Sequence, residues 1–182
     1  MDAALLTNYL QLLQKIDAFF SRVQGRYPEW IRCQAGCNDC CRRDLTLFSF
    51  EVERMVGFAR GLPAEDRARI GARAQGYTGQ EDHPCVFLEE RGCLIYDARP
   101  VICRSHGIPL LVPGEASISI CPLNFKGIKG IEGDCVLDLS PVNAILSALA
   151  HQVAGQTPGR MERVRVVDAV RGALDAAGGE PG

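Results

Sequence analysis

The sequence has no long apolar run, no excess of one sign of charge and no basic leader. Its 182 residues contain no uninterrupted apolar segment near the ~20 residues that a membrane-spanning helix needs. The formal net charge of −2 gives no reason to expect nucleic acid or an anionic membrane as a partner. The first residues, Met-Asp-Ala-Ala-Leu-Leu, lack the basic start of a signal peptide. We therefore expect a cytoplasmic protein that binds neither nucleic acid nor membranes.

The sequence also lacks the short motifs of several common enzyme classes. It contains no Gly-x-Ser-x-Gly elbow, no His-Glu-x-x-His pair and no Walker loop. The glycine-rich stretch from Gly127 to Gly133 fits no phosphate-binding fingerprint and is interpreted as a turn. These absences leave open whether the protein is an enzyme and whether its partner is a protein or a small molecule.

Length and composition indicate one folded domain. A chain of 182 residues with 47% hydrophobic residues is long enough to bury a core and is not disordered overall. We predict a single domain over residues 1–176, with a cysteine core at 33–121 and helices on both sides of it. Residues 177–182 are predicted to form a flexible tail.

Apolar residues at helical spacing predict most of the architecture. Ser49 is a suitable N-cap for the second helix, and Pro63 suits the first turn of the third. Two apolar stretches around a polar turn predict a small hairpin over residues 85–96. The predicted helices cover residues 3–24, 50–60, 63–75, a short segment from Pro100 to Gly107, a segment from Ser140 to Gly155, and about 160–175. The expected fold class is mainly α, with a small β-hairpin and a loop-rich cysteine core that a metal organises.

Cysteine is abundant and unevenly spread. Nine cysteines are present, and four of them fall within one short run, at Cys33, Cys37, Cys40 and Cys41. Disulfides are rare in a reducing compartment, and an odd number with an adjacent pair fits a disulfide framework poorly. A single buried cysteine is an ordinary small hydrophobe. Four of them together, beside Gly, Asn, Asp and Arg, indicate metal binding.

The spacing inside this run indicates more than one metal ion. Cys37 and Cys40 form a Cys-x2-Cys pair that can coordinate one metal centre, and Cys33 can be a further ligand of that centre. Neighbouring side chains point in different directions, so Cys40 and Cys41 are not expected to share one tetrahedral ion. We therefore predict two metal centres or one polynuclear cluster. In two-cluster ferredoxins, one cysteine of a closely spaced run likewise serves a second cluster.

The second half of the chain supplies further thiols. Cys93 lies across the predicted hairpin from Cys85, Cys103 lies on the short helix, and Cys121 precedes a proline. The predicted ligands, enough for two four-thiolate sites or one large cluster, are Cys33, Cys37, Cys40, Cys41, Cys85, Cys93, Cys103 and Cys121. Sulfur ligation excludes calcium and magnesium but fits both zinc and iron–sulfur. Cys135 has no motif around it and is predicted to be buried rather than a ligand.

Three further side chains stand close to these cysteines in the sequence. Beside thiolates, Arg99 and Arg104 would offset negative charge and donate hydrogen bonds, although both also fit as surface charges. His106 follows Cys103 by three residues. It is interpreted first as a histidine at a helix end and second as a supporting group of the metal site.

Together these residues resemble the YkgJ-like cysteine-cluster family, a zinc- or iron-chelating domain of the CxxCxxCC type. The first cluster, Cys33 to Cys41, has the longer-spaced form of that pattern, and Pro84-Cys85 matches its second element. The third element is matched closely by Cys93-Leu-Ile-Tyr-Asp-Ala-Arg-Pro-Val-Ile-Cys103-Arg, and Cys121-Pro122 fits the late cysteine. The resemblance covers about residues 33–121 and implies a metal-binding fold.

The resemblance also bears on the cofactor and the function. The family is similar to the cysteine-rich part of flagellin lysine N-methylases, for which an iron–sulfur cluster is the favoured cofactor. This implies an iron–sulfur site that serves redox or enzymatic chemistry, with zinc as the alternative. Two other functions remain open: a structural zinc module that binds a partner, and an iron-dependent enzyme that oxidises or methylates a protein or peptide. The sequence has no Rossmann-type fingerprint for a nucleoside cofactor.

Overall fold

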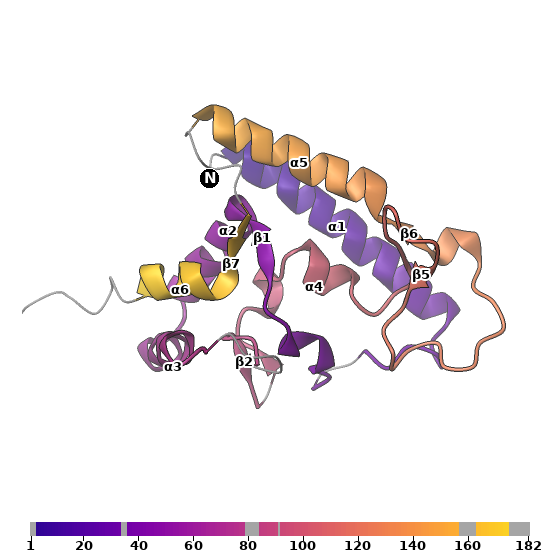
Figure 1. The fold of residues 1–182 in the computed structure, drawn as a ribbon, viewed down its shortest axis with the longest axis horizontal. Helices are drawn as coiled ribbons and strands as arrows, with labels where there is room; N and C mark the ends of the chain where they lie inside the picture. Colours follow the sequence, from indigo (N-terminus) through magenta and orange to yellow (C-terminus); the bar gives the residue numbers. More distant parts are fainter. Residues whose placement is uncertain (1–2, 34–35, 79–83, 91, 157–162, 175–182) are drawn as a thin grey trace, which may run out of the picture. The chain divides into compact units, whose positions relative to one another are not determined.

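The computed structural model describes residues 3–33, 36–78, 84–90, 92–156 and 163–174 (Figure 1). The tail predicted at 177–182 lies outside the described residues. Within the described part of the chain the α-helices are α1 Ala3–Arg26, α2 Ser49–Arg60, α3 Ala64–Gln75, α4 Val101–Ser105, α5 Leu139–Gln156 and α6 Val166–Leu174. Three 3₁₀ turns accompany them: η1 Asp39–Arg42, η2 Tyr96–Ala98 and η3 Gly133–Cys135.

The strands are short. They are β1 Thr46–Phe48, β2 Leu88–Glu89, β3 Gly92–Cys93, β4 Leu110–Leu111, β5 Ile118–Ser119, β6 Leu137–Asp138 and β7 Arg163–Arg165. Because helices dominate and the strands pair only in small sheets, the prediction of a mainly α fold is confirmed.

The chain divides into two compact units, each made from segments that are not adjacent in sequence. The first unit comprises Asn38–Arg99 together with the chain from Val153 onward, and the second comprises Asp2–Cys37 together with Pro100–Gln152. The prediction of one domain over 1–176 stays a prediction. The two units are described separately below.

In the first unit, α6 packs against α2 and α3, and β1 pairs with β7 beside α2 (Figure 1). Helical spacing of apolar residues on α2 and α6 brings their buried faces together. The apolar core of this unit contains Leu47, Val52, Met55, Val56, Ala59, Ile70, Ala74, Val86, Phe87, Ile95, Ala98, Val166, Val167 and Val170. Phe87 and Ile95 anchor the two ends of the hairpin in this core, which fixes the position of the cysteines beside them.

The hairpin predicted over residues 85–96 is confirmed. β2 and β3 are antiparallel, with Leu88 opposite Cys93. The Glu89 carboxylate of β2 forms an ion pair with the Arg73 guanidinium of α3 at 2.9 Å, and the Glu89 side chain is only 17% exposed. Helix α3 therefore holds the hairpin that carries Cys93.

The C-terminal segment differs from the sequence prediction, which placed a helix from about residue 160. Arg163–Arg165 form strand β7, antiparallel to β1 with Leu47 opposite Val164, and α6 begins only at Val166. The Arg163 guanidinium lies 4.4 Å from the centre of the Phe48 ring on β1. The sequence separation of Thr46 and Arg163 is 117 residues, so helical spacing within the segment could not reveal the partner strand.

In the second unit, α1 packs against α4 and η3. The helix predicted over 3–24 is confirmed and continues to Arg26, with a buried face formed by Leu5, Tyr9, Leu12, Leu13, Ile16 and Val23. Residues 108–139 contain a small sheet in which β4 pairs antiparallel with β5 and parallel with β6. This sheet and α4 place the later cysteines of the unit.

Three predicted helix starts are one residue away from those observed. Ser49 is the first residue of α2 rather than its cap, and Pro63 caps α3 rather than lying in its first turn. Helix α5 begins at Leu139 instead of Ser140, and the Asp138 carboxylate accepts a hydrogen bond from the Ser140 backbone at 2.7 Å. Several neighbouring groups can satisfy the free N–H groups of a first turn, so sequence fixes such boundaries only approximately.

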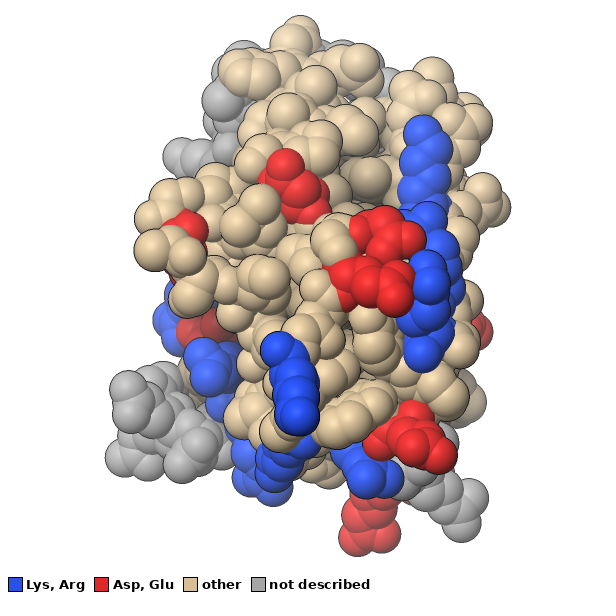
Figure 2. Space-filling view, turned by 90° about the vertical axis from the view of Figure 1, so that its right-hand side faces the viewer, with Lys and Arg blue, Asp and Glu red and all other residues tan. Residues whose placement is uncertain are grey.

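No described helix combines the length and the apolar character needed to cross a bilayer. On the face drawn in Figure 2, acidic and basic side chains lie next to each other rather than in separate areas.

The core of the first unit can be tested at Val170, whose exposed fraction is 0%. Val170→Ala removes two methyl groups and leaves a cavity, so we expect the free energy of unfolding to fall by about 2 kcal/mol. Ile145→Ala removes more carbon from an α5 side chain that is 42% exposed and should cost less than about 1 kcal/mol. Urea denaturation measures both losses. A larger loss for Ile145→Ala would contradict this description of the core.

Candidate metal centre

Turn η1 holds the adjacent pair of cysteines. The backbone N–H of Cys41 donates to the Asn38 carbonyl at 2.8 Å, which closes the turn. Cys41 raises the pKa of Cys40 through a side-chain hydrogen bond and through its charge, which places the two thiols near each other at this turn. That Cys40 and Cys41 do not share one tetrahedral ion stays a prediction.

The hairpin brings two more cysteines to η1 within the first unit. The backbone N–H of Cys85 donates to the Cys41 carbonyl at 2.6 Å, which ties the start of the hairpin to the turn. The charge of an ionised Cys40 raises the pKa of both Cys85 and Cys93, and the charge of an ionised Cys93 raises the pKa of Cys85. Four predicted ligands, Cys40, Cys41, Cys85 and Cys93, therefore belong to one neighbourhood. We call them the first-unit thiols.

The first-unit thiols are costly to ionise where they stand. Burial, together with the nearby Cys93 and Cys40, raises the pKa of Cys85 to about 11. The pKa of Cys93 is raised chiefly by burial, and that of Cys40 chiefly by its hydrogen bond to Cys41 and then by burial. A thiolate is the form that binds metal. These thiols therefore need a positive charge among them before they can all be ionised.

Several groups in the first unit lower the pKa values of Cys85 and Cys93 and so favour their thiolate forms. A backbone N–H two residues further along the chain reaches each hairpin thiol, from Phe87 to Cys85 and from Ile95 to Cys93, and lowers its pKa. The positive charge of Arg73 lowers the pKa of Cys85 as well. Backbone N–H groups that donate to sulfur are typical of the surroundings of iron–sulfur clusters.

Arg99 meets the expectation of a cation close to these thiols. Its charge lowers the pKa of both Cys40 and Cys93, against the larger effects that raise them. The guanidinium carbon lies 3.5 Å from the centre of the Tyr96 ring, and Nε donates to the Tyr96 carbonyl at 3.0 Å. Tyr96 thus fixes the guanidinium by a cation–π contact and a hydrogen bond. The sequence analysis identified Arg99 but not this role of Tyr96.

The other four predicted ligands, Cys33, Cys37, Cys103 and Cys121, belong to the second unit. Cys33 contacts a buried side-chain amide. Asn124 Nδ2 donates to its Sγ at 3.4 Å and to the Gly107 carbonyl at 2.6 Å, while Asn124 Oδ1 accepts the Arg32 N–H at 2.8 Å. Asn124 is only 4% exposed, so these bonds satisfy a buried amide.

The remaining three occupy different surroundings. Cys37 is exposed, Cys103 is half-buried on α4, and Cys121 is 8% exposed. The backbone N–H of Asn124 donates to the Cys121 carbonyl at 2.9 Å, which links Cys121 to the residue that contacts Cys33. The structure thus relates Cys121 to Cys33 through Asn124.

The two other expected supporting residues have separate environments in the second unit. Arg104 forms an ion pair with Asp17 of α1 at 2.5 Å. His106 takes the position after α4, where its backbone N–H donates to the Ile102 carbonyl at 3.1 Å. The helix-end interpretation of His106 fits this position. Their participation in a metal site stays a prediction.

The spacing of the sulfurs limits the kind of metal site. Tetrahedral zinc with Zn–S bonds of about 2.3 Å needs its sulfurs about 3.8 Å apart. Among the described residues, no three cysteine sulfurs lie within 4.8 Å of one another. The donor set suits a soft metal, but no three described sulfurs stand as close together as one zinc ion requires. The eight predicted ligands come from both units, so their grouping into two four-thiolate sites or one large cluster stays a prediction.

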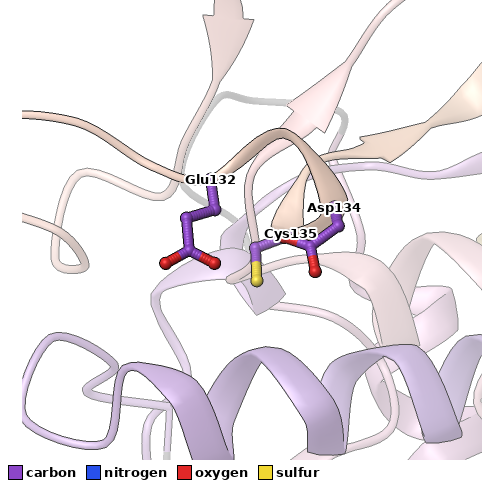
Figure 3. Close-up of side chains that lie close together, drawn as sticks. All are labelled: Glu132, Asp134 and Cys135. Carbon is purple, nitrogen blue, oxygen red and sulfur yellow. The ribbon is translucent and has the colours of Figure 1, made fainter.

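Within the described part of the chain, one trio of possible ligand atoms lies within 4.8 Å: Glu132, Asp134 and Cys135 (Figure 3). Arg26 of α1 already forms ion pairs with both carboxylates, at 3.0 Å to Glu132 and 3.4 Å to Asp134. Cys135 is fully buried. The trio is therefore explained by its pairing with Arg26. That Cys135 is not a ligand stays a prediction.

Sequence reasoning missed two residues that fix Cys33. Asn124 carried no signal, because a single asparagine in a loop is ordinary. Gly107 was interpreted only as the end of a helix, yet it has φ of 107°, and a Cβ there would lie 2.4 Å from Cys33 Sγ. A glycine shortly after a cysteine-bearing helix was the one available hint of a close approach.

Comparison with known proteins supports metal binding by this part of the chain. Residues 32–119 match the model of the family described as "CxxCxxCC: Putative zinc- or iron-chelating domain". The matched range contains seven of the eight predicted ligands and ends before Cys121. No curated protein and no solved structure matches the chain. The likeness to flagellin lysine N-methylases therefore stays a prediction.

The contact between Gly107 and Cys33 is testable with a matched glycine pair. Gly107→Ala would add backbone strain and a Cβ that displaces Cys33, whereas Gly114, with φ of 85°, has no atom within 4 Å of such a Cβ. Gly114→Ala should cost about 1–2 kcal/mol of unfolding free energy, the strain alone. We expect Gly107→Ala to cost more and to lower the metal content. Equal stability losses with unchanged metal content would show that the Cys33 position is unimportant.

Proposed function

We propose that the chain is a metal-binding protein with two four-thiolate centres, one in each unit, and that iron–sulfur clusters are their favoured occupants. Cys40, Cys41, Cys85 and Cys93 would hold the first centre. Cys33, Cys37, Cys103 and Cys121 would hold the second. The family match over residues 32–119 supports metal binding in general and leaves zinc and iron equally open.

The observation that carries the proposal is the neighbourhood of the first-unit thiols. Cys40 is hydrogen-bonded to Cys41, and it interacts electrostatically with the two hairpin cysteines. Four thiols in one neighbourhood offer the number of sulfur ligands that one metal centre takes. A bound cation would lower their pKa values and keep them as thiolates, the form that binds metal.

Two features favour a polynuclear cluster over a single zinc ion. No three described cysteine sulfurs lie as close together as one tetrahedral zinc ion requires, whereas several irons spread their ligands further apart. The N–H groups of Phe87 and Ile95 donate to the hairpin sulfurs, and hydrogen bonds of this kind tune the potential of a cluster. When bound, such a cluster supplies one-electron chemistry.

The protein's own residues then have distinct tasks at the first centre. The four cysteines would hold the metal, while Arg99 offsets thiolate charge near Cys40 and Cys93. Tyr96 keeps the guanidinium in place through its ring and its carbonyl. Because the Arg99 charge persists at all physiological pH values, its stabilisation of the thiolates does not depend on pH.

Metal and sulfide analysis of anaerobically purified protein tests the identity of the metal. We expect a brown protein that contains iron and acid-labile sulfide in nearly equal amounts, up to about eight of each per chain for two four-iron clusters. Visible absorption and electron paramagnetic resonance after reduction provide independent measurements. A colourless protein with stoichiometric zinc and no sulfide would overturn the iron–sulfur proposal and favour a structural zinc module.

Serine variants test the division into two centres. Cys41→Ser and Cys85→Ser should each remove about half of the metal, and Cys121→Ser should remove the other half. Cys135→Ser is the matched control, which should keep all the metal and cost about 1 kcal/mol of stability, as expected for a small buried group. Wild-type metal content in Cys41→Ser would contradict a two-centre site. Complete loss of metal in every ligand variant, with the protein still folded, would contradict independent centres.

A further inference from the structure

The second unit contains a hollow that the metal chemistry does not use. Two chain segments form its wall, residues 29–32 and 123–126, and it has a volume of about 510 Å³. Its lining residues are Glu29, Trp30, Arg32, Leu123 and Lys126. Cavities of several hundred cubic ångströms accommodate small molecules, which bind through apolar walls and a few well-placed polar groups.

The hollow presents an aromatic surface. Trp30 is the sole tryptophan of the chain, and 37% of it is exposed although it is a large apolar side chain. Its carbonyl accepts a hydrogen bond from the Phe125 N–H at 2.8 Å, so the two wall segments are fixed to each other next to the indole. An indole ring exposed at a hollow offers a flat face on which a ligand ring can stack.

The hollow also carries an excess of positive charge. Arg32 and Lys126 line it together with one carboxylate, that of Glu29. The ion pairs found among the described residues involve neither Arg32 nor Lys126. Two cations against one carboxylate give the lining a net positive charge, which attracts an anion, and arginine can bind a carboxylate through two parallel hydrogen bonds.

The wall is held in a conformation that costs energy. Phe125 has φ of 53°, in the left-handed region that few residues other than glycine adopt. It is 4% exposed and makes an edge-to-face contact with Tyr27, with ring centres 5.6 Å apart. Strain of this kind persists where the surrounding packing enforces it, and it is concentrated at functional sites. Here it presents Lys126, the next residue, to the hollow.

We propose that this hollow binds a small organic anion with a flat apolar part, of which an aromatic carboxylate is the simplest example. The ring would stack on Trp30, and the carboxylate would bind Arg32 and Lys126. The inference does not depend on which metal the cysteines hold. The wall is nevertheless connected to a predicted ligand, because the Arg32 N–H donates to Asn124, whose amide contacts Cys33.

Phenylacetate binding to the purified protein tests the proposal. Because Trp30 is the only tryptophan, its fluorescence reports directly from the hollow. We expect a saturable fluorescence change and matching heat in isothermal titration calorimetry. Lys126→Gln removes one charge-assisted hydrogen bond and should weaken binding about tenfold. Lys129→Gln removes the same charge from an exposed residue that does not line the hollow and should leave the affinity unchanged.

Two comparisons make the result decisive. Phenylacetamide, which has the ring without the charge, should bind at least about tenfold more weakly than phenylacetate. The metal content of the same Lys126→Gln sample should equal that of the wild type. This measurement distinguishes a loss of anion binding from a loss of metal, so the two proposals can fail independently. No saturable response to phenylacetate, equal binding of phenylacetamide, or equal weakening by both lysine variants would overturn the proposal.

Discussion

The first unit depends on one electrostatic constraint: thiols that are buried close together cannot all ionise unless positive charge lies among them. Burial and mutual repulsion hold the pKa of Cys85 at about 11 and raise those of Cys40 and Cys93. Arg99 supplies one positive charge near two of the thiols, which is less than four thiolates need. A bound metal would let these thiols ionise together, which would link metal binding to the stability of this unit.

In the second unit a neutral amide has the corresponding organising role. Asn124 joins three loops, because it bonds the backbone at Arg32, the carbonyl of Gly107 and the sulfur of Cys33. The same segment continues into the strained Phe125 and the wall of the hollow beside Trp30. A buried amide with all its bonds satisfied keeps these loops in register where little regular secondary structure is available.

Local patterns predicted the elements that depend on local forces. The helix from residue 3, the hairpin at 85–96 and the short helix bearing Cys103 follow from apolar spacing and turn residues, and all three are observed. Predictions failed where distant contacts decide. Strand β7 replaced the start of a predicted helix because β1, more than a hundred residues earlier in the chain, pairs with it.

The sequence by itself determined the metal-binding character, since residues 32–119 match a zinc- or iron-chelating domain and sulfur ligands select soft metals. It also determined the predominance of helix. Only the tertiary structure decided how the ligands are grouped. Counted along the chain, Cys33 and Cys37 belong with Cys40 and Cys41, yet the units place the latter pair with Cys85 and Cys93. The physical reason is that the chain passes through α2 and α3 between Cys41 and Cys85 and then comes back, so that the Cys85 N–H donates to the Cys41 carbonyl. The packing of these helices decides this return, and the spacing of the cysteines along the sequence does not predict it.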